Sequence, residues 1–256
     1  MHDLVITGGS VVDGTGAPAR TADVAVTDGV ITEVHGRTVS ILLGFQTFHP
    51  FNFTPAWGET GLGLLPWDEQ VRRIQSEPDL RARLIAEVAA LTDDPIIQGF
   101  MHPDRIYVLG DPPDYEPGHA ESVTGLAAAT GGDRWAKLLE LMLGDGGREL
   151  LNSPVANYSH GNLNSVREML LHPTSAFGLG DGGAHAGQTC DASTTTFLLT
   201  HWARDRAEGR LPVELAVHKT TQATATLYGL GDRGVLAPGL VGDVDAIDFD
   251  RLAPHR

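Results

Sequence analysis

The chain begins and ends with strand-like sequence, and this arrangement constrains its fold more than any other feature. Short runs rich in β-branched residues fill positions 4–34, and an alternating apolar run returns at 244–249. Between the two ends, short apolar runs alternate with amphipathic helical runs, which is the pattern of an α/β body. We expect the two ends, residues 1–36 and 233–256, to pair in one small β domain around a body formed by residues 37–232.

Glycine, proline and apolar spacing predict the elements of the chain. Pro78 stands where one helix begins, and Gly229 stands near the end of the last helix. The Asp28-Gly29 pair joins two alternating runs and predicts a hairpin. The predicted helices cover 67–75, 78–91, two runs within 118–144, 163–171, 194–209 and 212–230. The predicted strands of the body cover 39–45, 94–100, 105–111 and 174–181, and residues 48–57 form an aromatic loop broken by prolines.

The charge and the cysteine content narrow the classes of function. The formal net charge is −15 and the pI is near 5.0, so the surface repels nucleic acid and anionic membranes. A single cysteine, Cys190, excludes an internal disulfide and a zinc ribbon. No apolar run approaches the roughly 18 residues of a membrane span, and the first residues lack the pattern of a signal peptide. We therefore expect a cytoplasmic protein without a nucleic-acid or membrane partner.

The glycine-rich segment GLGDGGAHAGQTC, residues 178–190, is the strongest candidate for a functional site. Its glycines match the dinucleotide pattern G-x-G-x-x-G, but that pattern needs a helix that opens on the glycines, and here a loop continues. A metal site is a second interpretation, since Asp181, His185 and Cys190 carry ligand atoms, but their spacing fits no standard site. A third interpretation places Asp181 at the C-terminal end of an α/β-barrel strand, where barrel enzymes carry their catalytic groups.

Several stretches of the chain resemble the amidohydrolase superfamily, in particular the N-acyl-D-amino-acid deacylases (D-aminoacylases). They are DLVITGGSVVDGTGAPARTADVAVTDGVITEV near the start, GFQTFHPFNFTPAW after it, GLGDGGAHAGQTCDASTTTFLLTHWARDR, and TQATATLYGLGDRGVLAPGLVGDVDAIDFDRL near the end. Together these stretches touch most of the chain. The DGTGAP, DGGAH and DRGVLAP motifs are specific when they occur in this order.

The resemblance implies a fold and a reaction. The fold is a (β/α)8 TIM barrel with a small β-sandwich built from both chain ends. The reaction is hydrolysis of an amide, a non-peptide C–N bond, in a small N-acyl-D-amino acid by a water that Zn2+ activates. Asp181 matches the aspartate that serves as general base, and by the same resemblance it is a candidate zinc ligand. Gly182, Gly183 and His185 then line the substrate pocket.

The chain departs from that family where the zinc ligands should be. The family's first barrel strand ends in an H-x-H motif, and later strands supply a bridging cysteine or acid and two more histidines; none of these is recognisable here. Near residues 34–36 the resemblance jumps from the N-terminal segment to a late part of the barrel. A complete barrel needs about 250 residues and eight strands, and the body has only about four strand candidates. We therefore expect a partial barrel of late strands and helices, whose open edges favour assembly into an oligomer.

Three functions remain open on the sequence. The first is an N-acyl-D-amino-acid hydrolase with Asp181 as base. The second is an inactive remnant without the metal site, because the remaining histidines, His49, His102, His119 and His160, stand singly in loops or near strand ends. The third is a nucleotide-binding α/β protein, which rests only on the G-x-G-x-x-G match.

Overall fold

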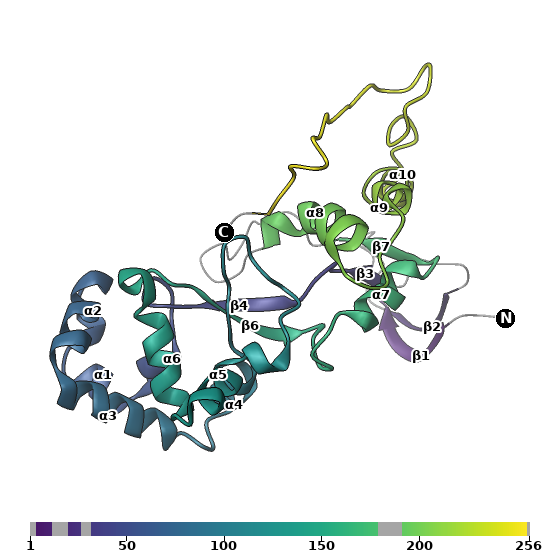
Figure 1. The fold of residues 1–256 in the computed structure, drawn as a ribbon. Coiled ribbons are helices and arrows are strands. Elements are labelled where there is room, and N and C mark those ends of the chain that lie inside the picture. The colour runs from purple at the N-terminus through teal and green to yellow at the C-terminus, as the bar shows by residue number, and fades with distance from the viewer. Residues whose placement is uncertain (1–3, 12–19, 27–31, 179–190, 255–256) are drawn as a thin grey trace.

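The computed structural model describes residues 4–11, 20–26, 32–178 and 191–254, and their strands form three small sheets (Figure 1). β1 and β2 form an antiparallel hairpin, and β3 pairs in parallel with β7. β4, β6 and β5 form an antiparallel sheet with β6 in the centre. The strands are β1 (Leu4–Val11), β2 (Arg20–Val26), β3 (Thr32–Val34), β4 (Val39–Leu43), β5 (Tyr107–Val108), β6 (Leu151–Ala156) and β7 (Ser175–Phe177).

Helices surround the strands at both ends of the body. Helices α1 to α6 gather at one end of the β4–β6–β5 sheet, and α7 to α10 lie around the β3–β7 pair (Figure 1). They are α1 (Pro55–Glu59), α2 (Trp67–Ser76), α3 (Pro78–Ala89), α4 (Pro95–Phe100), α5 (Val123–Thr130), α6 (Arg134–Met142), α7 (Asn164–Leu171), α8 (Thr194–Phe197), α9 (Val213–Thr220) and α10 (Gln222–Leu227). A π-helix, η7 (Leu198–Asp205), continues directly from α8.

The β4–β6–β5 sheet separates two apolar cores, because side chains along a strand alternate between the two faces. Leu43 and Leu151 belong to the first core, together with apolar side chains of α1 to α6. Leu42 and Tyr107 belong to the second core, which also takes in β7, α7 and η7 with its buried Trp202. The sheet therefore packs against one core on each of its two faces.

Most of the helices predicted from the sequence are confirmed. Helices α2, α3, α5, α6, α7, α9 and α10 coincide with amphipathic runs, and the run 194–209 forms α8 and η7. Pro78 is the first residue of α3, where its missing N–H leaves no helical hydrogen bond unmade. β4 lies within the predicted strand at 39–45, and β5 lies within 105–111.

One predicted strand is a helix. Residues 94–100 were expected to be extended on account of their apolar run, and they form α4 instead. The Asp94 carboxylate accepts hydrogen bonds from the N–H groups of Ile96 and Ile97 at 2.9 and 3.0 Å, and Pro95 occupies the first helical position. An aspartate cap followed by proline is a strong helix start, and here it outweighs the apolar run.

Two other segments also differ from the prediction. β6 is a strand that the sequence did not indicate, since Pro154 interrupts its pattern and cannot donate to a neighbouring strand. The expected loop at 48–57 contains a short 3-10 helix, η1 (Pro50–Phe53), and the start of α1. Prolines in the first turn of both helices explain why a proline-broken run is helical.

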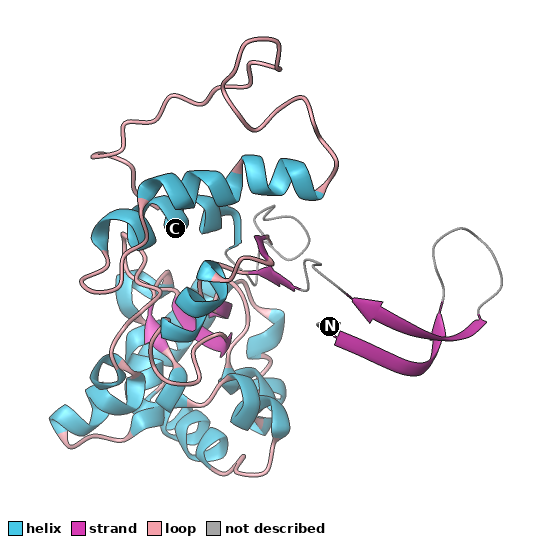
Figure 2. Ribbon diagram, turned by 90° about the vertical axis from the view of Figure 1, so that its right-hand side faces the viewer, coloured by secondary structure: helices cyan, strands magenta, loops and turns pink. Residues whose placement is uncertain are grey.

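Among the described residues, no strand of the N-terminal segment pairs with the C-terminal tail. β2 pairs with β1, and β3, expected in a hairpin with β2, pairs with β7; the Asp28-Gly29 turn lies outside the described residues. In the described tail, residues 231–254, no residue is in a strand, and the run at 244–249 is irregular. Figure 2 shows the β1–β2 hairpin apart from the helices, and the tail as a long loop. The division of the chain into two domains stays a prediction.

The α/β class is confirmed, whereas the partial barrel stays a prediction. A (β/α)8 barrel consists of parallel strands. Among the described residues, β3 and β7 are the one parallel pair, and the larger sheet is antiparallel. The described part of the chain holds no helix with the length and apolar character needed to cross a membrane.

Candidate functional site

The junction between β3 and β4, residues 35–38, lies beside the start of the glycine-rich segment. β3 and β7 end together, with Val34 opposite Phe177. The N–H of Gly178 then donates to the Val34 carbonyl at 3.2 Å. The chain therefore leaves β7 for the glycine-rich segment directly next to the junction.

Arg37 is a buried charge within this junction. The residue is 2% exposed, and its guanidinium lies 4.0 Å from the centroid of the Tyr115 ring. Its Nε donates to Thr194 Oγ1 at 3.3 Å. The attraction between a cation and an aromatic face grows when water is excluded, so the ring offsets part of the cost of burying the charge. Arg37 thereby connects the junction with the first residue of α8, which lies on the C-terminal side of the glycine-rich segment.

Two side chains hold the backbone of the junction. Asn157 Nδ2 donates to the carbonyl oxygen of His35 at 3.4 Å and to that of Arg37 at 3.2 Å. Trp202 Nε1 donates to the carbonyl of Gly36 itself at 2.5 Å. A Cβ at Gly36 would lie 2.6 Å from Cε2 of Phe177, so the close approach of the junction to β7 requires glycine.

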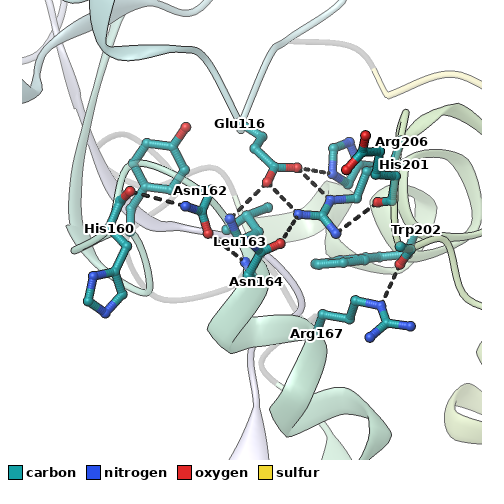
Figure 3. A network of polar contacts seen from close by, with 12 residues as sticks. Glu116, His160, Asn162, Leu163, Asn164, Arg167, His201, Trp202 and Arg206 are labelled. Atoms are coloured by element: carbon teal, nitrogen blue, oxygen red, sulfur yellow. Dashed lines mark hydrogen bonds and ion pairs between the residues drawn. The ribbon is translucent and has the colours of Figure 1, made fainter.

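A second polar cluster is centred on Glu116 (Figure 3). Arg206 binds its carboxylate through two N–H groups, with Nη2 at 2.8 Å from Oε1 and Nε at 2.9 Å from Oε2. His201 Nε2 lies 2.8 Å from Oε2, and the N–H of Leu163 donates to Oε1 at 2.8 Å. The carboxylate therefore ties η7 and the start of α7 to the loop that follows β5.

The protonation state of Glu116 limits what this cluster can do. Burial alone would raise the pKa of the carboxyl, but hydrogen bonds from Arg206, His201 and the Leu163 N–H outweigh burial and lower the pKa to about 2. Hydrogen bonding to the same carboxylate raises the pKa of Arg206. A carboxylate that stays ionised and already accepts four contacts is suited to holding structure and poorly suited to proton transfer.

Asn152 is a polar side chain in the interior of the β4–β6–β5 sheet. It lies between Leu42 and Tyr107 in the register of the three strands, and it is fully buried. Within the described part of the chain, neither atom of its side-chain amide has a hydrogen-bond partner. A buried amide without partners lowers stability by about 1–3 kcal/mol.

The histidines considered as zinc ligands are spread over the fold. His49 is enclosed by the rings of Phe45, Phe51 and Trp57, and burial lowers its pKa to about 3, so it is a neutral packing residue. The others are His102 before η3 (Pro103–Arg105), His119 at the start of η4 (His119–Glu121) and His160 in an exposed turn. Among the residues that the structure describes, no three His, Cys, Asp or Glu side chains converge as a metal site requires.

Comparison with known families decides where the chain belongs. Residues 66–255 match the sequence model of the amidohydrolase family. The chain belongs to the amidohydrolase family. The matched region runs from just before α2 to the tail and includes residues 178–190, and membership supports a hydrolase of amide or other C–N bonds. No curated protein and no solved structure gives a match.

The residues predicted for the site of this amidohydrolase-family chain fall on one segment. Asp181, Gly182, Gly183 and His185 all lie outside the described residues, as does Cys190. The structure does describe what borders the segment. β7 and Gly178 precede it, and the helical turn η6 (Asp191–Ser193) and α8 follow it.

Sequence reasoning missed the junction residues. Arg37 and Thr194 are 157 positions apart, and Trp202 and Gly36 are 166 positions apart, so no local pattern links either pair. The one signal available in the sequence is an arginine between two strand-like runs. An arginine in that place is far more often a solvated surface residue than a buried one.

Proposed function

We propose that this amidohydrolase-family chain hydrolyses the amide bond of N-acyl-D-amino acids, with Asp181 as general base. The family match over residues 66–255 carries the reaction class. The order of the DGTGAP, DGGAH and DRGVLAP motifs supports the narrower resemblance to D-aminoacylases. Asp181 comes four positions after Phe177, the last residue of β7, which supports a place beyond the C-terminal end of a buried strand. On this assignment β7 is the last strand of a partial barrel.

The proposed reaction has two steps, the attack of water on the amide carbonyl and the breakdown of the tetrahedral intermediate. Asp181 takes a proton from water, and the water oxygen attacks the carbonyl carbon of the acyl group. The tetrahedral intermediate then loses its C–N bond, the nitrogen receives the proton from Asp181, and the carboxylic acid and the amino acid leave. Gly182 and Gly183 present no Cβ atoms to the substrate, and His185 lines the pocket.

Zinc is the cofactor that the resemblance implies, and the described residues do not fit it. They bring no three ligand side chains together, and His49 is sealed among aromatic rings. When bound, zinc would supply a Lewis acid and a more acidic water. No step above passes through the metal, and the zinc requirement is tested by experiment.

The test is the release of free amino acid from N-acetyl-D-amino acids by the purified chain, with added Zn2+ and with a chelator. N-acetyl-L-amino acids serve as the stereochemical comparison. We expect turnover of the D substrates that falls at least about a hundredfold in Asp181→Asn, which is the usual effect of removing a general base. Asp205→Asn alters an exposed carboxylate of η7 and should retain activity. Full activity in Asp181→Asn would overturn the role of that residue, and hydrolysis of no acyl amino acid would overturn the substrate class.

The dispersed histidines favour a second candidate, a family member that has lost catalysis. It predicts a folded chain that takes up no zinc after dialysis against trace Zn2+ and turns over no amide. Elemental analysis of monodisperse protein measures the stoichiometry. About one zinc per chain, together with turnover, would exclude this candidate.

A further inference from the structure

The described tail is attached to the helices near both of its ends. Figure 1 shows it leaving α10 and running back towards α8 and η7. Near its start, Gly234 packs so closely on α10 that a Cβ there would lie 3.0 Å from the Cβ of Ala225. Near its end, Arg204 of η7 donates to the carbonyl oxygen of Phe249 and, at 2.8 Å, to that of Leu252. The residues between these two attachments therefore form an arch that is fixed at both ends.

A cavity of about 710 Å³ lies between this arch and the helices. Thr196 of α8, Leu199 of η7 and Val217 of α9 belong to one side of it, and the tail forms the other. Sites for small molecules in proteins typically measure about 300–1,000 Å³, so the cavity has the size of such a site. The helical side includes η7, and π-helical segments are rare and frequently occur at functional sites.

The lining of the cavity exposes a group of apolar side chains. Six of them are each at least 37% exposed: Val217, Val235, Leu236, Val241, Val244 and Ile247. Single exposed apolar residues are common, but a group of them around one cavity is typical of a binding site. A molecule with a hydrocarbon body would remove this surface from water, and that removal favours binding.

The charged groups on the lining are both negative. They are Asp243 and Asp245, and among the described residues no lysine, arginine or histidine lines the cavity. Arg233 binds the carboxylate of Asp243 at 3.1 Å. The exposed Asp245 carboxylate has no such partner within the described part of the chain. Because apolar walls concentrate the field of a nearby charge, the cavity attracts cations and repels anions.

We propose that this cavity binds a small amphipathic cation, an amine or quaternary ammonium with an alkyl or aryl body. The hydrocarbon body lies against the apolar lining, and the positive charge lies beside Asp245. This site goes beyond the proposed hydrolysis, since no residue assigned to that reaction lines the cavity. An N-acyl amino acid carries a carboxylate, which the acidic lining repels.

Three probes with the same eight-carbon chain separate the effect of charge from that of apolar contact. Octyltrimethylammonium is a cation, 1-octanol is neutral, and octanoate is an anion at pH 7. Each is titrated into the full chain by isothermal titration calorimetry, below the concentration at which it forms micelles. We expect one octyltrimethylammonium per chain with a Kd below about 1 mM. The Kd of 1-octanol should be about fivefold higher, and octanoate should not bind measurably.

Two variants of the tail test the two parts of the site. Asp245→Asn should weaken binding of octyltrimethylammonium about fivefold and leave 1-octanol unchanged, because it removes the charge alone. Ile247→Ser should weaken binding of both probes about fivefold, because it removes apolar contact. Both side chains are exposed, so neither substitution should disturb the fold.

Matched control variants alter the same residue types at the other end of the molecule. Asp93→Asn changes an exposed carboxylate in the turn before α4, and Ile96→Ser changes an isoleucine of α4 that is 42% exposed, against 49% for Ile247. Neither residue lines the cavity. Both controls should bind octyltrimethylammonium within about twofold of wild type.

Several results would overturn the proposal. Equal weakening in Asp93→Asn and Asp245→Asn, or uptake of many cations per chain without saturation, would mean general attraction to a surface of net charge −15. Absence of binding, or octanoate binding as tightly as the cation, would also refute it. Light scattering gives the mass of the unliganded chain, and a dimer that Ile247→Ser separates would show that a second copy covers the cavity instead. Because none of these readouts involves hydrolysis, an inactive chain refutes the proposed function and leaves this result standing.

Discussion

Replacing Glu116 by glutamine should lower the unfolding free energy by about 3 kcal/mol at pH 7. The folded carboxyl has its pKa lowered from 4.5 to about 2, against the effect of burial, by Arg206, His201 and the Leu163 N–H. A difference of that size between the unfolded and folded pKa corresponds to about 3 kcal/mol in favour of the ionised folded form. Removal of one member of a buried ion pair typically costs about 3–5 kcal/mol, which agrees with this magnitude.

The same pKa determines how the effect depends on pH. Because the folded pKa is lower than the unfolded one, the contribution of Glu116 is fully present above about pH 5 and is lost as the pH falls towards about 2. Glutamine has no such titration. The difference between wild type and Glu116→Gln should therefore be largest at neutral pH and shrink steadily below about pH 5.

Urea unfolding followed by tryptophan fluorescence, at pH 7 and at several acid pH values, measures both effects. Glu140→Gln is the matched control, since Glu140 pairs with Lys137 at 2.8 Å on an exposed surface. An exposed pair of this kind contributes less than about 1 kcal/mol. If Glu116→Gln is no more destabilised than Glu140→Gln at pH 7, or if its deficit does not shrink in acid, the reasoning about the buried carboxylate is wrong.

Two further substitutions test packing at the junction and in the sheet. Gly36→Ala places a Cβ 2.6 Å from the Phe177 ring and should destabilise the protein by about 1–3 kcal/mol. Gly58→Ala, whose new Cβ meets no atom within 4 Å, should be neutral or stabilising by up to about 1 kcal/mol in the same urea assay, and equal effects would contradict the steric explanation. Asn152→Leu removes a buried amide and should raise stability by about 1 kcal/mol in thermal unfolding; a lower melting temperature would contradict it.

Local signals account for the elements that sequence reasoning predicted well. A helix is specified by residues three and four apart, so α3 and α6 could be predicted from their own residues. The wrong strand prediction at 94–100 also has a local cause, because it rests on the apolar run alone, whereas Asp94 and Pro95 in front of that run start a helix. A stricter use of capping rules would have found α4.

Strand pairing and the junction depend on contacts between distant residues. β3 was predictable as a strand, but its partner was not. It pairs with β7, which places Thr32 opposite Ser175, and neither segment has a sequence pattern that indicates the other as its partner. Asp181 could be singled out because it lies within a recognisable motif. Arg37 could not, because its importance comes from Tyr115 and Thr194, which the fold brings to it.

The position of the β4–β6–β5 sheet between the two cores has a consequence for synthesis of the chain on the ribosome. β4 ends at Leu43, but the central strand β6 begins only at Leu151. When α1 to α6 have left the exit tunnel, the sheet that covers their apolar faces is still incomplete. Nascent segments in this state are prone to aggregate and bind chaperones. Newly made chains should therefore stay with a chaperone until β6 has emerged and paired with β4.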